Sequence, residues 1–322
     1  MFDATSPCEP LRDRDLQRVD GAARVAVKSE GGRTMLAELY QRSPCKVLFP
    51  HVDGEKWREA VFLNTAGGVA GGDVLRYEAL ATGEASLVVT TQAAERVYRA
   101  IDTAGRVETR IEARDTATLE WLPQETILFD GGRLSRSTEI HCASGASVLA
   151  MDWLILGRAA SGERVAAGEV RDHWRLYRDG RLVWADAFRL GGDIAALQVK
   201  KPLLSGCNAI ATLLYTALDA AVQLEHAREL LSKVAASQPS PLAGEGGAER
   251  RRVRGTAAGA VPMDSDGEPP IYAGATVVNG VLVCRLAAAD ASDLRAAVIE
   301  FLRAFRGRLR GKPVSLPKVW TC

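Results

Sequence analysis

The sequence predicts a mainly β protein with a smaller C-terminal α/β portion that contains two helices. Two observations support this fold class. From about residue 24 to residue 190, apolar positions alternate, and Gly, Asp, Asn and Pro interrupt them at short intervals. In the last third of the chain the apolar residues recur with helical spacing instead. Many short strands fit a sandwich, a barrel or a solenoid, and no repeat of fixed length decides among them.

Individual segments show the strand pattern clearly. Residues 106–113, RVETRIEA, alternate between an apolar or small face and a charged face, which is typical of a half-exposed strand. Asp179-Gly180 lies between two apolar-rich runs, and Asn279-Gly280 repeats this arrangement. Both pairs tolerate the positive φ of a tight turn, so we expect a β-hairpin at each of them.

The C-terminal third predicts two helices. Residues 209–215, AIATLLY, fit a buried strand or the start of a helix. Residues 218–237 predict the first helix. Its apolar face consists of Leu218, Val222, Leu230 and Val234. The second helix is expected to begin near Asp290 or Ser292, either of which is a suitable N-cap.

The second predicted helix is amphipathic. Its apolar side consists of Leu294, Val298, Phe301, Leu302, Phe305 and Leu309. Its other side carries Arg295, Arg303, Arg306 and Arg310. We interpret the arginine side as a solvated face of a helix that packs on the core, with a docking surface for an acidic partner as the alternative.

Composition divides the chain into four segments. Residues 1–23 are expected to be a flexible N-terminus, and residues 24–236 a β-rich scaffold that runs into the first helix. Residues 237–270 are rich in Pro, Gly, Ala and Arg without periodicity, which predicts a disordered insertion. Residues 271–322 are expected to add a hairpin and a helix that complete the same domain.

Charge and cysteine usage exclude several classes of protein. The 322 residues carry a formal net charge of +1, so no global field favours nucleic acid or an anionic membrane. No stretch approaches the ~20 apolar residues of a membrane span, and the N-terminus has no apolar leader segment. The six cysteines are dispersed without the spacing of a zinc site, which favours reduced thiols. We therefore expect a cytoplasmic protein.

The most unusual motif is LNTAGGVAGGDVL, residues 63–75, which contains Gly67, Gly68, Gly71 and Gly72. A dinucleotide or phosphate loop requires different glycine spacing and a helix after it, whereas a strand-like run, VLRYEAL, follows here. The glycines therefore predict a structural turn between two strands, where the backbone adopts positive φ or approaches another segment closely. Asp73 either accepts hydrogen bonds from amides of that turn or presents its carboxylate at the corner.

No standard catalytic motif is present, but carboxylates are scattered near apolar strands. They are Asp73, Asp130, Asp152, Glu163 and Asp186. Each either has a functional role or pairs with a local arginine such as Arg133, Arg158 or Arg189. A carbohydrate-active hydrolase that uses Asp130 and Asp152 is one alternative function. A nucleic-acid-binding module that uses the arginines of residues 250–254 is a less favoured one.

Five motifs, taken in order, resemble the urease accessory protein family UreD, also called UreH. The similarity extends from about residue 24 to the C-terminus. The motifs are GGVAGGD (67–73), VVTTQAAERVYR (88–99), LEWLPQETILFDGGRL (119–134), LGRAASGE (156–163) and LPKVW (316–320). The sequence departs from the family pattern at Thr65-Ala66, where prolines are more usual, and in the long insertion near residue 240.

The resemblance implies a non-enzymatic scaffold built from stacked, solenoid-like β-sheets. It implies binding to UreF, through UreF to the GTPase UreG, and docking on apo-urease, with nickel passing through an internal channel. No permanent cofactor is expected, only transient Ni²⁺. The positions that match polar channel-lining positions of the family are Asp73, Thr90, Thr91, Gln92 and Asp186. Scattered carboxylates and hydroxyls suit such a route, because a conduit must hold the ion weakly enough to release it.

Overall fold

The computed structural model describes residues 17–50, 57–158, 162–201, 203–236 and 271–320. The described chain is mainly β, with 53% of residues in strands and 16% in helices, which confirms the predicted fold class. Its helices are α1 (Ile194–Gln198), α2 (Leu224–Ala236) and α3 (Ala291–Arg310), and a 3-10 turn, η3 (Lys318–Trp320), follows. The expected disordered insertion, 237–270, lies outside the described residues, and so do residues 250–254 within it.

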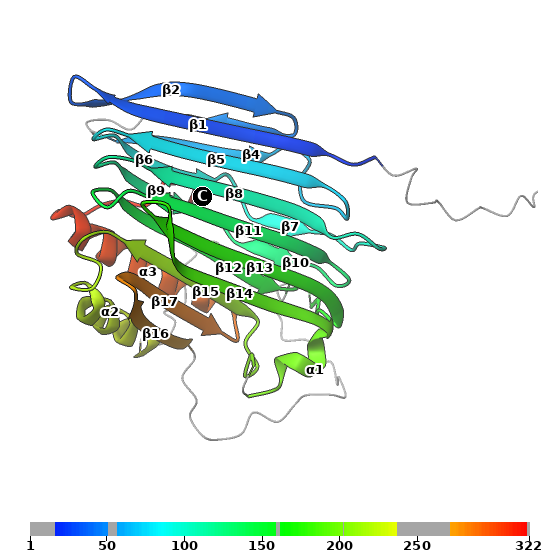
Figure 1. Ribbon diagram of the computed structural model, residues 1–322. Coiled ribbons are helices and arrows are strands. Elements are labelled where there is room, and N and C mark those ends of the chain that lie inside the picture. The colour runs from blue at the N-terminus through cyan, green and yellow to red at the C-terminus, as the bar shows by residue number, and fades with distance from the viewer. Residues whose placement is uncertain (1–16, 51–56, 159–161, 202, 237–270, 321–322) are drawn as a thin grey trace, which may run out of the picture.

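The strands form two sheets that lie one over the other (Figure 1). The seven-stranded sheet consists, in spatial order, of β14 (Arg181–Asp193), β13 (Ala167–Arg178), β11 (Arg133–Cys142), β8 (Gly105–Ala113), β5 (Val74–Thr82), β1 (Asp20–Glu30) and β2 (Arg33–Arg42). The ten-stranded sheet consists of β16 (Ile271–Val278), β17 (Val281–Ala288), β15 (Ala209–Thr216), β12 (Ser147–Leu156), β9 (Thr118–Leu122), β6 (Ser86–Thr91), β4 (Arg58–Asn64) and β3 (Cys45–Leu48), with β10 (Thr126–Leu128) and β7 (Glu95–Val97) beside it.

The solenoid character follows from the order in which the chain fills the two sheets. From β4 to β13 the longer strands alternate between the layers, so each turn adds one strand to each sheet. Neighbouring turns are therefore parallel, as in the β5–β8, β8–β11 and β11–β13 pairs of one sheet and the β6–β9 and β9–β12 pairs of the other. Parallel pairing requires a crossover between strands, and here the opposite sheet provides it.

Two apolar cores hold three layers together. One core fills the space between the sheets, and the other lies between the ten-stranded sheet and the helices α2 and α3. Because both faces of the ten-stranded sheet are covered, β12 is buried at nearly every position, with Leu154 in the first core and Trp153 in the second. Figure 1 shows α2 and α3 beside β16 and β17 at one end of the stack.

Several local predictions are confirmed. Asp179 and Gly180 have positive φ and join β13 to β14, and Asn279 and Gly280 join β16 to β17 in the same way. Residues 209–215 form part of a strand, β15. Asp290 is the N-cap of α3, where its side chain accepts a hydrogen bond from the Ser292 N–H.

The predicted starting residue of the first C-terminal helix, Leu218, is wrong. The helix begins at Leu224, and Leu218 and Val222 are 87% and 77% exposed instead of facing the core. The reason is a hydrogen-bonded turn around Asp219, whose carboxylate accepts from the Tyr215 hydroxyl at 2.8 Å and from Gln223 Nε2 at 2.6 Å. This arrangement competes with continuation of the helix, as aspartate commonly does.

The prediction that solvent covers the arginine side of the last helix is also wrong. Arg306 is 1% exposed and donates to Glu120 Oε2 at 2.7 Å and to the Ser315 carbonyl at 2.8 Å. Arg310 donates to the other oxygen of Glu120, and Arg295 donates to Glu125 at 2.7 Å. Strand β9 directs Glu120 to the outer face of its sheet, against α3, so the arginines compensate a buried carboxylate. Of the four arginines, Arg303 is exposed as predicted.

Candidate functional site

The glycine cluster is a strand-to-strand connection between β4 and β5, as the sequence predicted. Two of its glycines are required by close approach. A Cβ on Gly68 would lie 2.4 Å from a ring carbon of Tyr98, and one on Gly71 would lie 2.5 Å from the Thr103 carbonyl oxygen. Any side chain at either position would collide with the next turn of the solenoid.

Asp73 holds this connection in place. Its side chain is buried, and its two oxygens accept from the Val19 N–H at 3.0 Å and the Ala70 N–H at 2.8 Å. The turn-stabilising alternative therefore describes the observed geometry. Contact of Asp73 with transient nickel stays a prediction.

The TTQ motif distributes its side chains to different surroundings. Thr90 is fully buried in the core between the ten-stranded sheet and the helices, where its hydroxyl accepts a hydrogen bond from Trp320 Nε1 at 3.0 Å. Thr91 points the other way and lines a cavity between the sheets, and its hydroxyl accepts from the Gln124 N–H at 2.8 Å. Gln92 is exposed. Strand alternation separates the three side chains, so only Thr91 faces the space between the layers.

A small inner cavity of about 40 Å³ lies between the two sheets. Besides Thr91, its polar lining includes Glu95, Thr109, Arg136 and Asp152. Burial raises the pKa of Glu95 to about 7, and the neighbouring Asp73 charge acts in the same direction. The Glu95 carboxylate accepts a hydrogen bond from Asn64 Nδ2 at 3.2 Å, which acts in the opposite direction.

A second, wider cavity of about 490 Å³ opens on the other side of Arg136 and Asp152. Its charged lining also includes Asp172, Asp186 and Arg285. Asp186, which the sequence proposed as a channel position, lies in this wall and pairs with Arg285 at 2.5 Å. Asp186 therefore pairs with an arginine, but with one from a distant strand and not with a local arginine such as Arg189.

Arg136 and Asp152 contribute to both cavities, so they form the partition between them. Arg136 donates to Asp152 at 3.0 Å and to Asp172 at 2.5 Å, and Thr138 donates to the second Asp152 oxygen at 3.3 Å. Burial raises the pKa of Asp152. Burial opposes the charged form of Arg136, but the two carboxylates outweigh this effect and raise its pKa.

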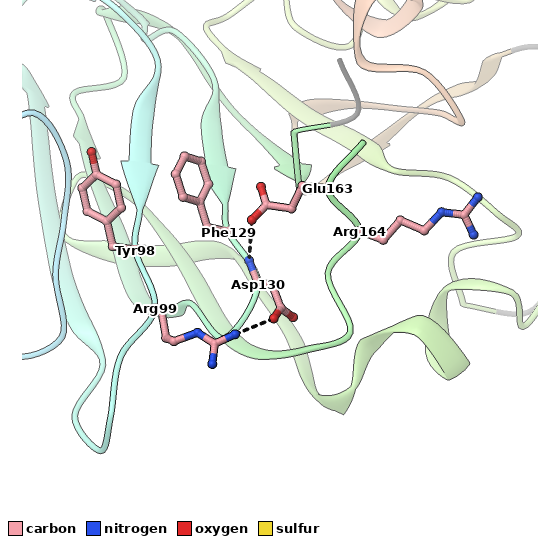
Figure 2. Close-up of a pocket in the computed structure, with 6 residues that line it drawn as sticks. All are labelled: Tyr98, Arg99, Phe129, Asp130, Glu163 and Arg164. Atoms are coloured by element: carbon pink, nitrogen blue, oxygen red, sulfur yellow. Dashed lines mark hydrogen bonds and ion pairs between the residues drawn. The ribbon is translucent and has the colours of Figure 1, made fainter. Parts of the chain in front are cut away.

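A third hollow, of about 570 Å³, lies at the edge of the molecule and is shown in Figure 2. Asp130 accepts from Arg99 at 2.7 Å and from the backbone N–H groups of Ala166 and Ala167, and these contacts lower its pKa, with the Ala167 bond contributing most. Glu163 accepts from Arg158 at 2.8 Å, as the sequence proposed. The carboxylates of this hollow therefore stabilise loops.

The geometry disfavours the hydrolase alternative. Asp130 lies in the edge hollow, whereas Asp152 lies in the partition between the two inner cavities, so they do not form the paired carboxylates that glycoside hydrolysis requires. In the part of the chain that the structure describes, no group of three or more His, Cys, Asp or Glu side chains is arranged to hold a metal ion. No helix of that part is long and apolar enough to cross a membrane.

The charged cavity residues that the sequence did not identify include Glu95, Arg136, Asp172 and Arg285. A signal existed for Arg136. In β11, RLSRSTEIHC, the buried positions alternate, and Arg136 falls in phase with the apolar Leu134 and Ile140. A charged residue in phase with a buried face indicates a buried partner on another strand, but it does not say which one.

Comparison with known proteins decides the family. The family model described as UreD urease accessory protein matches residues 19–321. The chain belongs to the UreD family. UreD of Xanthobacter autotrophicus is 39% identical over 321 residues, which cover 98% of this chain and 96% of that protein. UreD of Methylobacterium sp. is 37% identical, with 99% of both chains covered.

Membership in the UreD family confirms the resemblance of the five motifs and a role in urease maturation. UreD is named as an accessory protein and not as an enzyme, in agreement with the prediction from the sequence.

Proposed function

We propose that this UreD family member recruits UreF, and through it UreG, to apo-urease and conducts nickel between its two sheets to the urease active site. The observation that carries the nickel route is the shared partition, because Arg136 and Asp152 line both the inner and the outer cavity. The two cavities adjoin at these residues, and we interpret them as successive compartments of one passage. The recruitment of UreF and UreG rests on family membership.

Carboxylates are placed along the passage at intervals. Glu95 lies in the inner cavity, Asp152 in the partition, and Asp172 and Asp186 in the outer cavity. Such oxygens attract a divalent cation without enclosing it. Because the described residues form no multi-ligand metal cluster, the ion is held weakly at each step and can be released to the next.

Of the positions proposed from the family pattern, Thr91 and Asp186 line this passage. Asp73 acts on it at longer range, because its charge adds to the effect of burial, which is the main cause of the raised pKa of Glu95. The side chains of Thr90 and Gln92 lie away from the passage in this structure.

The test uses cells that carry the urease genes and are supplied with nickel. The gene for this chain is deleted and then restored as wild type, as Glu95→Gln or as the matched control Glu84→Gln, whose side chain is exposed in the turn between β5 and β6. We expect deletion to abolish urease activity, and wild type and Glu84→Gln to restore it. Glu95→Gln should restore less, while it still co-purifies with UreF. Full activity after deletion would overturn the proposed function.

A further inference from the structure

Arg136 bridges the two sheets at the point where the inner and outer cavities adjoin. It lies on β11 of the seven-stranded sheet, directly opposite Asp172 of the neighbouring strand β13. Asp152 approaches from β12 of the ten-stranded sheet. Arg136 therefore borders both cavities, between the two carboxylates that it contacts.

The ionic cluster of Arg136, Asp152 and Asp172 is incompletely hydrogen-bonded. Arg136 Nε and Asp172 Oδ1 are buried, and neither has a hydrogen-bond partner within the described part of the chain. Both residues are more than nine-tenths buried. An unpaired buried polar atom costs on the order of 1–3 kcal/mol, so a cluster that served only to stabilise the fold would be expected to satisfy these atoms.

The charges of the cluster are also unequal. One guanidinium faces two carboxylates. Burial raises the pKa of Asp152, the Arg136 charge opposes this rise, and the Asp172 charge adds to it. If a divalent cation lay between the same two ionised carboxylates, the assembly would have no net charge. This charge balance is the electrostatic reason for a divalent cation to replace the guanidinium, and the cost of dehydrating the cation opposes it.

We propose that Arg136 is the gate of the passage, a guanidinium that holds the place of a divalent cation between Asp152 and Asp172 and is displaced when such a cation crosses. This inference rests on the proposed function for the identity of the cation as nickel. The outer cavity, of about 490 Å³, provides space for the displaced side chain. The wall of this cavity also contains Asp186, which pairs with Arg285.

The experiment measures nickel binding by the full-length chain in equilibrium dialysis against NiCl₂ alone. Arg136→Met removes the charge and keeps an unbranched side chain, so it leaves Asp152 and Asp172 free to bind a cation. We expect this variant to hold about one more Ni²⁺ per chain than wild type, at least tenfold more tightly than any ion that wild type holds there. The triple variant Arg136→Met, Asp152→Asn, Asp172→Asn should lose the additional ion.

Two results would overturn the gate. One is a folded Arg136→Met chain that binds no more nickel than wild type, and the other is a triple variant that keeps the additional ion. If Arg136→Met is unfolded without metal, circular dichroism gives the answer, because NiCl₂ should restore its strand signal whereas NaCl of equal ionic strength should not. Absence of rescue by NiCl₂ then rejects the proposal.

This readout is independent of urease. If Arg136→Met gains the ion but deletion of the gene leaves urease active, the cation exchange stands and the maturation function fails. If deletion abolishes urease activity but Arg136→Met gains no ion, the function stands and the gate fails.

Discussion

The protein contains two buried clusters in which arginine meets carboxylate, and they differ in how well they are satisfied. On the outer face of the ten-stranded sheet, Glu120 accepts from Arg306 and Arg310, and none of the three residues has a buried atom without a partner. Between the sheets, Arg136 and Asp172 each leave one such atom. The outer cluster lines none of the three hollows described above, whereas the inner cluster separates two of them.

The difference shows that burial and pairing alone do not distinguish a structural ion pair from a functional one. Both clusters have short contacts and low exposure. The outer cluster fixes α3 and the C-terminal segment to the sheet, through Arg306 and the Ser315 carbonyl. What marks the inner cluster is a combination of adjacent empty volume, unsatisfied atoms and excess negative charge.

The largest expected effect is loss of stability from the outer cluster. Arg306→Met should lower the free energy of unfolding by about 3–5 kcal/mol, because the buried Glu120 carboxylate loses its main partner. Arg303→Met is the matched control on the exposed side of the same helix and should change stability by less than about 0.5 kcal/mol. Urea unfolding measures both values. Equal effects of the two variants would contradict the structural role of Arg306.

The next effect separates the clusters by their response to metal. Arg136→Met should lose about 3 kcal/mol of stability, and millimolar NiCl₂ should recover part of this loss, because an ion that binds only the folded state stabilises it. Arg306→Met should show no such recovery. Thermal unfolding with and without NiCl₂ gives the comparison, and recovery in both variants would show that the two clusters do not differ in this way.

A smaller effect concerns the pH dependence of stability. In the folded chain the pKa of Glu95 is about 7, above its ordinary value of 4.5. The contribution of this group to the stability of the fold is therefore greatest below pH 4.5 and is lost as the pH rises through 7. Glu95→Gln cannot ionise, so it should be more stable than wild type at about pH 8, by about 1–3 kcal/mol, with a smaller gain at about pH 5. Melting temperatures of both proteins at the two pH values test this. A gain that does not change with pH would show that Glu95 is not destabilised by ionisation.

The smallest expected effect lies where the C-terminal motif meets the TTQ motif. Trp320→Phe removes the indole N–H that donates to Thr90 at 3.0 Å but preserves an aromatic ring over Trp153. The loss should be about 1 kcal/mol, the net value of a buried hydrogen bond. Unfolding of Trp320→Phe and of Thr90→Val, alone and combined, forms a double-mutant cycle. Additive losses would show that the two side chains are not coupled.

The sequence predicted the fold class because strand alternation is a local property. The pattern of residues 106–113 and the Asp179-Gly180 turn need no knowledge of distant segments, and both agree with the structure. The Arg306 error has the opposite origin. Helical spacing places Arg306 on the polar side, but only the three-dimensional neighbour Glu120, 186 residues earlier in the chain, makes burial of that side favourable.

The candidate site was predictable only in part for the same reason. Thr91 and Asp186 were proposed from the family pattern, and they line the inner and the outer cavity, respectively. The partition was missed because its members come from three strands, with Asp152 16 and Asp172 36 residues from Arg136. No spacing rule joins such residues, since their proximity depends on how the solenoid turns stack.

The central claim is that the inner cluster, and not the outer one, lies on the nickel route. The most direct measurement is urease activity per urease molecule in cells grown over a series of nickel concentrations. One strain carries the inner variant Arg136→Met, Asp152→Asn, Asp172→Asn, and another the outer variant Glu120→Gln, Arg306→Met. The account predicts that the inner variant requires more nickel for the same activity while it co-purifies normally with urease, and that the outer variant follows wild type at equal protein level. Superimposable curves for the two variants would contradict it.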